Sequence, residues 1–487
     1  MSNYDVIILG SGPGGYLAAE RLAAEKIKVA LIEKQDVGGT CLNVGCIPTK
    51  TLLNSAKLYA HAVEGAKFGI EVEGAKVNWT RVQAWKDEVV ARLRRSVEFT
   101  LKKEGVDIIR GWGSLAGGHS VVVRQAEPGT GAPAPEASSA ARGARSSADA
   151  VPPPAEVRLD ADQIIVATGG SPILPPIPGA KGNPVVLDST GMLGLKEIPQ
   201  SICVIGGGVI GVEFASLFSS LGSKITVIEM MDEIVPVMDP QMAMALRNAL
   251  KQVTFMRSTK VTAIEGNKVL YEAKSGEKGA VEASVILMSV GRKANIEGWG
   301  AQEAGLEIKN RAVAADARLR TNLPGIWAIG DVTGKSQLAH AAYRMAEVAV
   351  ADILAVRAGT KSAAQFVPET VPWALFSLPE AAGVGLTERE AVARGYEVTV
   401  LKTPYAVSGR FVAENGITAP GSIKIVVEKG TERILGVAML GAYASEHIWG
   451  LTLALERRLT LRALREMVFP HPTVSEVIRE AAWSANV

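Results

Sequence analysis

Near the N-terminus, the pattern of apolar and polar positions changes its period twice. Residues 6–9 form a short apolar run typical of a buried strand, and a glycine-rich turn follows. Further on, the apolar positions recur every three to four residues, as in an amphipathic helix, before a second apolar run that ends at Glu33. This order predicts strand, helix and strand, which together form one βαβ unit.

The same pattern occurs a second time, beginning at Ile202. An offset of 196 residues carries four positions, Gly10, Gly12, Gly15 and Glu33, onto Gly206, Gly208, Gly211 and Glu229 without a gap. A single G-x-G-x-x-G motif is weak evidence in a chain with 50 glycines, but two copies in one register are specific. The chain therefore contains an internal duplication.

Both copies have the features of a dinucleotide site. The first two glycines let a pyrophosphate approach the backbone at the start of a helix, and the third lets that helix pack against the strand. A glutamate at the end of the second strand accepts hydrogen bonds from a ribose diol and repels a 2′-phosphate. No arginine follows Glu229 in the segment 227–234, so we expect NAD rather than NADP at the second site. Two sites predict two dinucleotides that exchange electrons, one of them a tightly held flavin.

Residues 126–156 have a different composition. Of these 31 positions, 23 are Ala, Pro, Ser or Gly, and the segment has no aromatic residue, Leu or Ile. It cannot bury enough apolar surface to offset the entropy of ordering. We expect a flexible excursion between a strand at Val121–Val123 and a strand that ends at Gly170. A tolerated surface insertion is favoured over a functional tether.

The second half of the chain predicts a further domain. An apolar strand pattern ends at Asp331, where a carboxylate commonly faces a ligand, and a helical pattern runs from Gln337 to Val356. From about Phe366, strand-like runs alternate with turns, and helices are expected at residues 444–456 and 475–485. This part of the chain reads as an α+β domain.

Composition excludes several classes of protein. The 52 basic and 50 acidic residues leave a net charge of +2, too small for a nonspecific binder of nucleic acid or an anionic membrane. No apolar run approaches the ~18 residues of a spanning helix, and no signal peptide is recognisable. Three cysteines do not make a disulfide-stapled secreted scaffold. We expect a soluble, cytoplasmic protein without a metal site.

Two of the three cysteines, Cys41 and Cys46, lie five residues apart in the string GGTCLNVGCIPTK. A disulfide could close this short loop if the local helix is distorted, and tension in the loop would make the bond reducible. The alternatives are a metal site, for which two thiols without an adjacent histidine are a poor ligand set, and two inert buried thiols. His471, between two prolines and five residues before Glu476, is the best base candidate among five histidines, although a structural role is the alternative.

At this point, several motifs together resemble one family. GGTCLNVGCIPTK, the N-terminal GSGPGG, GGGVIGVE, AIGD and the C-terminal HPTVSE occur in the order and spacing of the class I flavoprotein disulfide reductases, and most resemble their dihydrolipoamide dehydrogenase branch. The resemblance implies an α/β fold with two Rossmann-like dinucleotide-binding domains, for FAD and NAD, and a C-terminal α+β dimerisation domain. The implied boundaries are 1–185 (FAD), 186–283 (NAD), 284–360 (central segment completing the FAD site) and 361–487 (interface).

The resemblance also implies roles for individual residues. Cys41 corresponds to the interchange thiol that meets substrate, and Cys46 to the thiol that faces the flavin. Lys50 corresponds to the lysine beside the flavin, with Glu213 as its acidic partner. His471 corresponds to the base that takes a proton from the substrate thiol, oriented by Glu476, and in the family it acts across an obligate homodimer. The implied cofactor-binding positions are Gly10, Gly12, Gly14, Gly15, Glu33, Lys50, Gly113, Thr168, Gly169, Asp331, Gln337, Leu338, Ala339, His340, Gly206, Gly208, Gly211, Glu213, Glu229, Val261 and Gly291.

The function implied by the resemblance is FAD-dependent oxidation of protein-bound dihydrolipoamide with reduction of NAD⁺. The implied partner is a lipoyl-bearing protein of a 2-oxo acid dehydrogenase or glycine cleavage complex. The alternatives are another disulfide reductase of the family, of the glutathione- or mercuric-reductase type, and a non-catalytic flavoprotein interaction module. Glu229 argues against the NADPH-dependent glutathione type, and the lack of a cysteine after Cys203 argues against the mercuric type. Pro470 departs from the usual alanine before the histidine.

Overall fold

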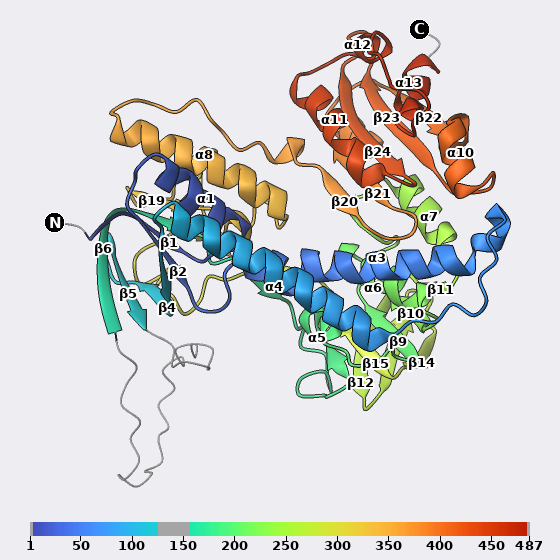
Figure 1. Cartoon of the computed structure of the whole chain (residues 1–487), viewed down its shortest axis with the longest axis horizontal. Coiled ribbons are helices and arrows are strands. Elements are labelled where there is room, and N and C mark those ends of the chain that lie inside the picture. The colour runs from blue at the N-terminus through green and yellow to red at the C-terminus, as the bar shows by residue number, and fades with distance from the viewer. Residues whose placement is uncertain (1–2, 125–155, 485–487) are drawn as a thin grey trace. The chain divides into compact units, whose positions relative to one another are not determined.

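A computed structural model describes residues 3–124 and 156–484 (Figure 1). The predicted excursion at 126–156 lies outside the described residues except for Glu156. The chain forms two compact units, each assembled from three stretches of sequence. The first unit contains residues 1–48, 87–171 and 292–368, and the second contains residues 49–86, 172–291 and 369–487. This division is coarser than the four predicted domains, which stay a prediction.

The first unit is built on one seven-stranded sheet in the order β3-β2-β1-β6-β5-β4, with β19 also paired to β6. Its strands are β1 (Tyr4–Leu9), β2 (Val29–Glu33), β3 (Asp107–Arg110), β4 (Trp112–Leu115), β5 (Ser120–Arg124), β6 (Glu156–Val166) and β19 (Ile326–Ala328). β1, β2, β3, β19 and the C-terminal half of β6 run parallel, whereas β4, β5 and the N-terminal half of β6 pair antiparallel. The apolar runs predicted as strands are therefore the buried centre of this sheet.

Two helices cover one part of this sheet. α1 (Pro13–Ala24) follows the first glycine turn and packs against α8 (Ala339–Arg357), as Figure 1 shows. The helix predicted from Gln337 begins two residues later because Leu338 is its extended N-cap residue. The strand predicted to end at Gly170 ends at Val166, since the chain then turns through Gly169, whose φ is +72°.

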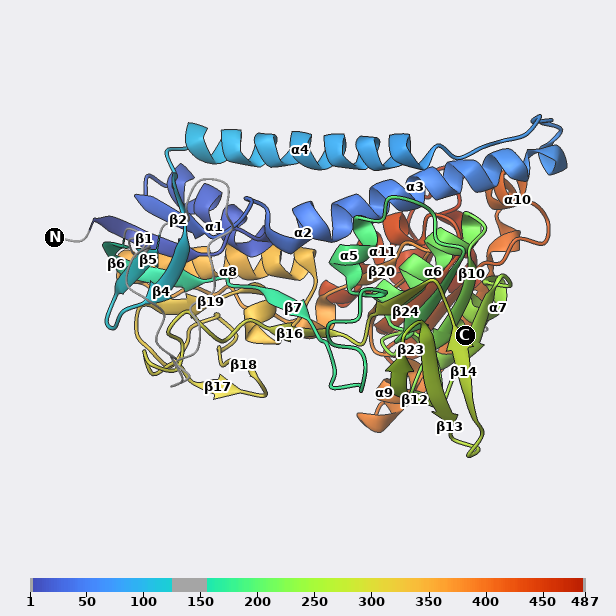
Figure 2. The same cartoon turned by 90° about the horizontal axis from the view of Figure 1, so that it is seen from below.

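The second unit repeats the parallel pattern in a five-stranded sheet of order β11-β10-β9-β15-β8. Its strands are β8 (Val186–Leu187), β9 (Ser201–Ile205), β10 (Lys224–Ile228), β11 (Val253–Met256) and β15 (Val285–Met288), and its helices are α5 (Ser189–Leu193), α6 (Val209–Ser220) and α7 (Pro240–Ala249). Figure 2 shows a separate antiparallel sheet of β12 (Thr259–Glu265), β13 (Lys268–Ala273) and β14 (Lys278–Glu282). Both predicted βαβ units are confirmed.

The C-terminal part of the second unit is the predicted α+β layer. Its antiparallel sheet has the order β20-β21-β24-β23-β22, made of β20 (Trp373–Leu375), β21 (Ala381–Gly385), β22 (Val398–Pro404), β23 (Ser422–Glu428) and β24 (Ile434–Leu440). Its helices are α9 (Glu388–Ala393), α10 (Gly409–Asn415), α11 (Ala444–Glu456), α12 (Leu461–Arg465) and α13 (Glu476–Trp483). The predicted helix at 444–456 is confirmed with the same bounds, and the one at 475–485 is shorter by one residue at its start and ends at Trp483.

The remaining elements are short or connect these layers. The helices are α2 (Gly39–Val44), α3 (Cys46–Val63) and α4 (Trp79–Lys103), with single 3₁₀ turns η1 (Gly65–Phe68), η2 (Gly330–Thr333), η3 (Pro368–Thr370) and η4 (Tyr405–Val407). The short strands are β7 (Gly170–Pro172), β16 (Arg292–Ala294), β17 (Ile308–Lys309) and β18 (Ala312–Val313). Among the described residues, no helix combines the length and the apolar character needed to cross a membrane.

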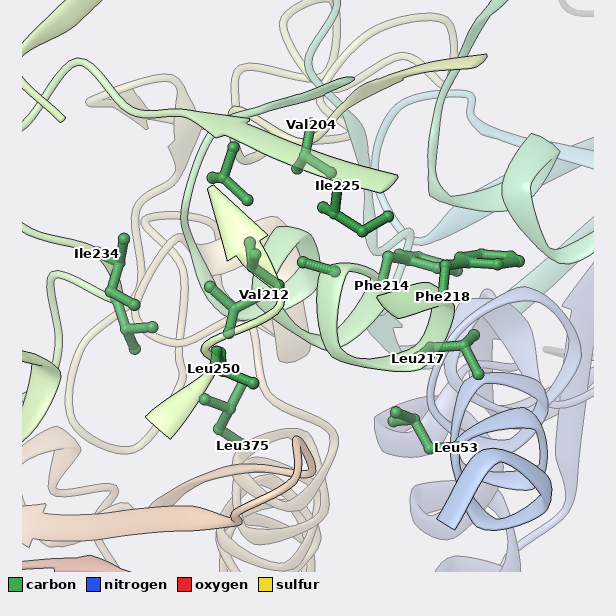
Figure 3. Close-up of a cluster of buried hydrophobic side chains, with 14 of the residues drawn as sticks. Leu53, Val204, Val212, Phe214, Leu217, Phe218, Ile225, Ile234, Leu250 and Leu375 are labelled. Carbon is green, nitrogen blue, oxygen red and sulfur yellow. The ribbon is translucent and has the colours of Figure 1, made fainter. Parts of the chain in front are cut away.

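The core of the second unit shows why α6 is fixed in place. Phe214 and Phe218 lie side by side on α6, with ring centroids 6.4 Å apart and an interplanar angle of 14° (Figure 3). Both side chains are completely buried, together with Leu217 and Val212 on the same helix. Burial of each such side chain contributes about 1.5–3 kcal/mol. The N-terminus of α6, where the second glycine turn lies, is therefore held rigidly at the carboxyl edge of its sheet.

Candidate cofactor and redox site

The first glycine turn joins β1 to α1. Gly10 has φ +100°, and a Cβ atom there would lie 2.3 Å from the carbonyl oxygen of Ala167. A Cβ atom on Gly15 would lie 1.9 Å from the carbonyl oxygen of Gly10, whereas one on Gly12 would meet no atom within 4 Å. The first and third glycines are thus required by packing inside the protein, and the second faces open space at the start of a helix. This is the arrangement that a phosphate group needs.

The second glycine turn, between β9 and α6, has the same geometry. Gly206 has φ +101°, and its added Cβ atom would lie 2.6 Å from the carbonyl oxygen of Ser289. The corresponding distance for Gly211 is 2.1 Å from the carbonyl oxygen of Gly206, and Gly208 faces open space. The duplication predicted from the 196-residue offset therefore extends to the shape of the loop.

The two glutamates occupy equivalent positions at these loops. Glu33 Oε2 accepts hydrogen bonds from the amide of Ser11 at 2.9 Å and from its hydroxyl at 2.6 Å. Glu229 Oε2 accepts a hydrogen bond from the amide of Gly207 at 2.6 Å, and its Oε1 accepts one from the amide of Met231 at 2.7 Å. Both carboxylates are thus held at the edge of a glycine loop by backbone donors. Ser11 was not among the predicted residues, because no local motif marks a residue whose hydroxyl binds a distant carboxylate.

Asp331 lies far from the first loop in the sequence, at the end of the strand that extends the sheet of the first unit. It follows β19 within η2, and burial raises the pKa of its carboxyl group, with the nearby Arg292 guanidinium acting in the opposite direction. The Nε atom of Arg292 lies 3.7 Å from Asp331 Oδ2. A Cβ atom on Gly170 would lie 3.2 Å from the Cβ atom of Asp331, so backbone and carboxylate meet closely here.

The other predicted cofactor positions fall into distinct surroundings. Thr168 donates through its hydroxyl to the carbonyl of Asn295 at 2.9 Å, and Gln337 donates to the carbonyl of Arg292 at 3.2 Å. Gly113 lies in β4, where a Cβ atom would press on Leu9 at 2.8 Å. The remaining predicted residues sit in loops or at helix and strand positions: Gly14 within α1, Leu338, Ala339 and His340 at the start of α8, Val261 in β12, and Gly169 and Gly291 at positive φ.

The cysteine motif breaks into two helices. Cys41 lies within α2, and Cys46 is the first residue of α3, while Gly45 between the helices has φ −145° and ψ −110°. Both cysteines are half-buried. The expected loop is thus a short helix followed by a break at Gly45. A Cβ atom on Gly45 would lie 2.9 Å from the carbonyl oxygen of Thr40, so the break depends on glycine.

Asn43 links α2, which contains Cys41, to the turn that precedes this helix. Its Nδ2 group lies within hydrogen-bonding distance of the carbonyl oxygens of Asp36, Val37 and Gly39, at 3.1–3.3 Å. Its position in the string between the two cysteines was the only sequence signal for this role. The side chain therefore stabilises the backbone that presents Cys41.

Lys50 and Glu213 form the ion pair that the family pattern predicts. Lys50 Nζ lies 2.9 Å from both carboxylate oxygens of Glu213, whose side chain is only 4% exposed. Glu213 Oε1 also accepts a hydrogen bond from the amide of Phe376 at 3.1 Å. Glu213 is therefore buried within α6 and does not lie on a solvated face of that helix. The two contacts with a buried carboxylate therefore hold the Lys50 ammonium in one place.

His471 and Glu476 form a second pair, in the C-terminal part of the second unit. His471 Nδ1 lies 2.9 Å from Glu476 Oε1, and the imidazole is 79% exposed while the carboxylate side chain is 6% exposed. Glu476 also accepts a hydrogen bond from the amide of Thr473, and this bond, followed by the one from His471, lowers the pKa of Glu476. A carboxylate that receives Nδ1–H leaves Nε2 of His471 as the proton acceptor, exposed to a reactant.

Two tyrosines lie near the thiols within the first unit. The hydroxyl groups of Tyr16 on α1 and Tyr343 on α8 hydrogen-bond to each other, and their rings make an edge-to-face contact with centroids 5.9 Å apart. Burial, followed by the neighbouring phenol and the thiol charge of Cys41, raises the pKa of Tyr16. Neither tyrosine was predicted, because a lone tyrosine in a helix carries no motif.

Comparison with known proteins places this geometry in a family. The model of the pyridine nucleotide-disulphide oxidoreductases matches residues 4–346, and the model of their dimerisation domain matches residues 371–482. The chain belongs to this family. Membership makes the protein a flavoprotein oxidoreductase with a disulfide redox centre, FAD and a pyridine nucleotide as cofactors, and a dimerisation domain that supports a homodimer.

Relatives across the family cover the whole chain. Dihydrolipoyl dehydrogenase of Bacillus subtilis (strain 168) is 37% identical over 100% of this chain and 98% of its own length. Dihydrolipoyl dehydrogenase of Thermus scotoductus is 37% identical over 99% and 97%, and dihydrolipoyl dehydrogenase 3 of Pseudomonas aeruginosa is 36% identical over 100% and 98%. Among solved structures, the Cu(II) complex of the HOCl-induced flavoprotein disulfide reductase RclA from Escherichia coli matches with a TM-score of 0.82 and 30% identity over 99% of both chains.

The chain's own residues fit the cofactors of this family. The open space at Gly12 and at Gly208, each at the start of a helix, accommodates a pyrophosphate at each loop, and a held carboxylate lies beside each loop for a ribose. No cluster of three or more His, Cys, Asp or Glu side chains suited to a metal ion occurs among residues 3–124 and 156–484.

Proposed function

We propose that this oxidoreductase is a dihydrolipoyl dehydrogenase, which oxidises protein-bound dihydrolipoamide to lipoamide and reduces NAD⁺. The His471–Glu476 pair carries the proposal, because oxidation of a dithiol needs an exposed base that can take the proton of a thiol. Full-length identity of 36–37% to dihydrolipoyl dehydrogenases supports the same substrate.

The residues of the chain would divide the reaction as follows. Nε2 of His471 of the partner subunit takes a proton from one thiol of dihydrolipoamide, and the resulting thiolate attacks Sγ of Cys41 in the oxidised Cys41–Cys46 pair. The Cys41–Cys46 bond breaks, and Cys46 leaves as thiolate. The second substrate thiol then displaces Cys41, which closes the lipoamide disulfide and leaves both cysteines reduced with the electron pair. When bound, FAD would supply the acceptor for this electron pair and the link to the nicotinamide.

For the flavin, we propose the first glycine loop as its site, with Glu33 at the ribose and Asp331 at the sheet edge. By the family resemblance, the Lys50 ammonium would lie beside the flavin ring, and its ion pair with Glu213 fixes where that ammonium lies. The second loop takes the nicotinamide dinucleotide. Glu229 supports NAD over NADP, because its carboxylate, held by two amides, would repel a 2′-phosphate.

A second candidate is a disulfide reductase with another substrate, as in the structurally similar RclA. The two candidates share the cysteine pair and differ in the disulfide that they accept. Steady-state assays of the purified yellow protein with NADH or NADPH against lipoamide and oxidised glutathione separate them. We expect turnover with NADH and lipoamide. Turnover confined to NADPH or to another disulfide would overturn the assignment.

Cysteine variants test whether the pair carries this turnover. Cys41→Ser should lower turnover with dihydrolipoamide and NAD⁺ by at least a thousandfold while FAD stays bound, because no interchange thiol remains. Cys203→Ser is the matched control, since burial raises the pKa of the Cys203 thiol to about 12 within β9 and removes it from thiolate chemistry. Turnover retained in Cys41→Ser would contradict the proposed mechanism.

A further inference from the structure

Arg292, a residue with no role in the reaction above, connects three parts of the first unit. It begins β16, and its side chain is only 13% exposed. Its Nη2 group donates to the carbonyl oxygen of Gly170 and reaches Thr40 Oγ1 at 3.5 Å, while its Nε lies 3.7 Å from Asp331 Oδ2. The backbone carbonyl of Arg292 accepts a hydrogen bond from the side-chain amide of Gln337. One guanidinium therefore lies near both the Asp331 carboxylate and Thr40 of α2, the helix that contains Cys41.

The place of Thr40 gives this contact its meaning. Thr40 lies in α2 directly before Cys41, so the guanidinium reaches the residue adjacent to the interchange thiol. A cation near a thiol stabilises the thiolate relative to the thiol. The planar fork of arginine can hold a carbonyl, a hydroxyl and a carboxylate in fixed directions, which a lysine ammonium cannot do.

Other titratable groups also face the thiols. Beside burial, negative charge on Cys41 contributes to the raised pKa of Tyr16 on α1 and of Tyr343 on α8. Negative charge on Cys46 also contributes to the raised pKa of Tyr343. Burial raises the pKa of both phenols, so they remain neutral at working pH. Asp331 carries the opposing negative charge, which Arg292 partly neutralises. Within this set, the charge that favours a thiolate is that of Arg292.

We propose that Arg292 is a positioning residue for the redox pair. It links α2, which contains Cys41, to the Asp331 carboxylate, and it stabilises the thiolate form of the reduced pair. This rests on the proposed role of Cys41 and Cys46. Two-electron reduction by dihydrolipoamide or NADH breaks one S–S bond and produces two cysteine sulfurs, which take up protons only as far as their thiol pKa values require. By favouring the thiolate, Arg292 shifts the pair toward the reduced state and keeps Cys41 nucleophilic.

The test measures the thiol without any lipoamide. The protein with bound FAD is reduced with a phosphine, and the rate of alkylation by iodoacetamide is followed from pH 5 to pH 9, with the label assigned to Cys41 by peptide fragmentation. Arg292→Gln should raise the apparent thiol pKa by at least 0.5 and slow alkylation at pH 6.5 at least threefold. Arg292→Lys, which keeps the charge, should stay closer to the unmodified protein.

Arg320 provides a matched control within the same unit. It makes a two-bond ion pair with the completely buried Asp352, at 2.5 and 2.8 Å. Arg320→Gln should therefore lower thermal stability without moving the thiol pKa. If Arg292 only supports the fold, Arg292→Gln will behave like Arg320→Gln, and that result would overturn the proposal.

A second variant covers the case in which Arg292→Gln does not fold. Thr40→Val removes only the oxygen that Arg292 reaches and keeps the size of the side chain. We expect a smaller rise of the thiol pKa in the same direction, and an unchanged titration would contradict the proposal. Failure of the proposed lipoamide activity is a separate outcome, because it would be seen in the unmodified protein while the thiol titration of the variants still differed.

Discussion

The two glycine loops differ less in themselves than in what surrounds them. At the first loop, Gly14 packs beneath Ile329 and the carbonyl of Ala342, at 3.2 and 3.3 Å from an added Cβ atom. The equivalent position of the second loop is Ile210, because 14 + 196 = 210. The first loop is therefore enclosed by η2 and α8, as expected for a cofactor that stays bound.

One turn further along each helix, the contrast becomes chemical. Leu17 of α1 corresponds to Glu213 of α6, since 17 + 196 = 213. Glu213 is buried and paired with Lys50, so the helix of the second loop also carries a fixed ion pair. The first sheet is instead extended by β19, which leads to Asp331. The glycine positions of the two loops thus have matching geometry, whereas the residues around them differ.

The largest effect should come from a Cβ atom at the first glycine of each loop. Gly10→Ala combines a left-handed φ with a 2.3 Å overlap on the Ala167 carbonyl, so we expect loss of bound FAD and a lower melting temperature. Gly206→Ala has the matching strain at the second loop and should keep FAD but raise KM for the nucleotide at least tenfold. Flavin absorbance and nucleotide titration measure the two outcomes. Equal loss of FAD in both variants would contradict the assignment of FAD to the first loop and of the nicotinamide nucleotide to the second.

Removal of the charge on Glu213 should have the next largest effect. Glu213→Gln leaves Lys50 with a neutral partner in a buried setting, and we expect flavin reduction by NADH to slow 10- to 100-fold, equivalent to about 1.4–2.8 kcal/mol. FAD content should stay unchanged. Glu347→Gln, which weakens an exposed pair with Arg344, is the control and should leave the rate as it is. Stopped-flow absorbance gives the rate, and no slowing would show that the pair is structural only.

Neutralising the two strand glutamates sharpens the comparison further. Glu229→Gln should raise KM for NADH about tenfold, or about 1.4 kcal/mol, with kcat nearly constant, because the ribose loses a charged acceptor. Its preference over NADPH should fall, since the repulsion of a 2′-phosphate is gone. Glu33→Gln should leave both nucleotide constants alone and weaken FAD retention instead. A change of NADH KM in Glu33→Gln would contradict the assignment of the loops.

The smallest effect concerns Asp331. Because the pKa of Asp331 is raised in the folded protein, the unfolded chain loses this proton at a lower pH than the folded protein does. The folded state therefore loses stability as the pH rises from the ordinary pKa of about 4 to the raised pKa. Asp331→Asn should remove this decline: the FAD-free proteins should melt together at low pH and differ by roughly 1–3 °C at neutral pH, with the variant higher. Melting curves across this range decide it, and a less stable variant at neutral pH would reverse the sign.

The two glycine loops could be predicted from the sequence because their conformational requirements are local. A glycine whose φ is +100°, and a glutamate that follows 23 residues later, leave a pattern that any second copy repeats. His471 and Glu476 were found for the same reason, since their contact spans only five residues. The helix and strand patterns fixed most elements but not their ends, which depend on turns such as the one at Gly169.

Contacts between distant segments left no such pattern. Arg292 meets Thr40 across 252 residues of chain, and the hydroxyl of Tyr16 meets that of Tyr343 across 327. Neither pair has a periodicity or a motif, so only the fold brings the residues together. Lys50 and Glu213, 163 residues apart, could be paired from the sequence only through the family resemblance.

The most direct test of the account separates its two entry points for electrons. In Cys46→Ser with FAD bound, under anaerobic conditions, NADH should still bleach the flavin through the second loop, whereas dihydrolipoamide should leave it oxidised because the sulfur route is cut. The unmodified protein should be reduced by both. Bleaching of the Cys46→Ser flavin by dihydrolipoamide at the unmodified rate would contradict the account.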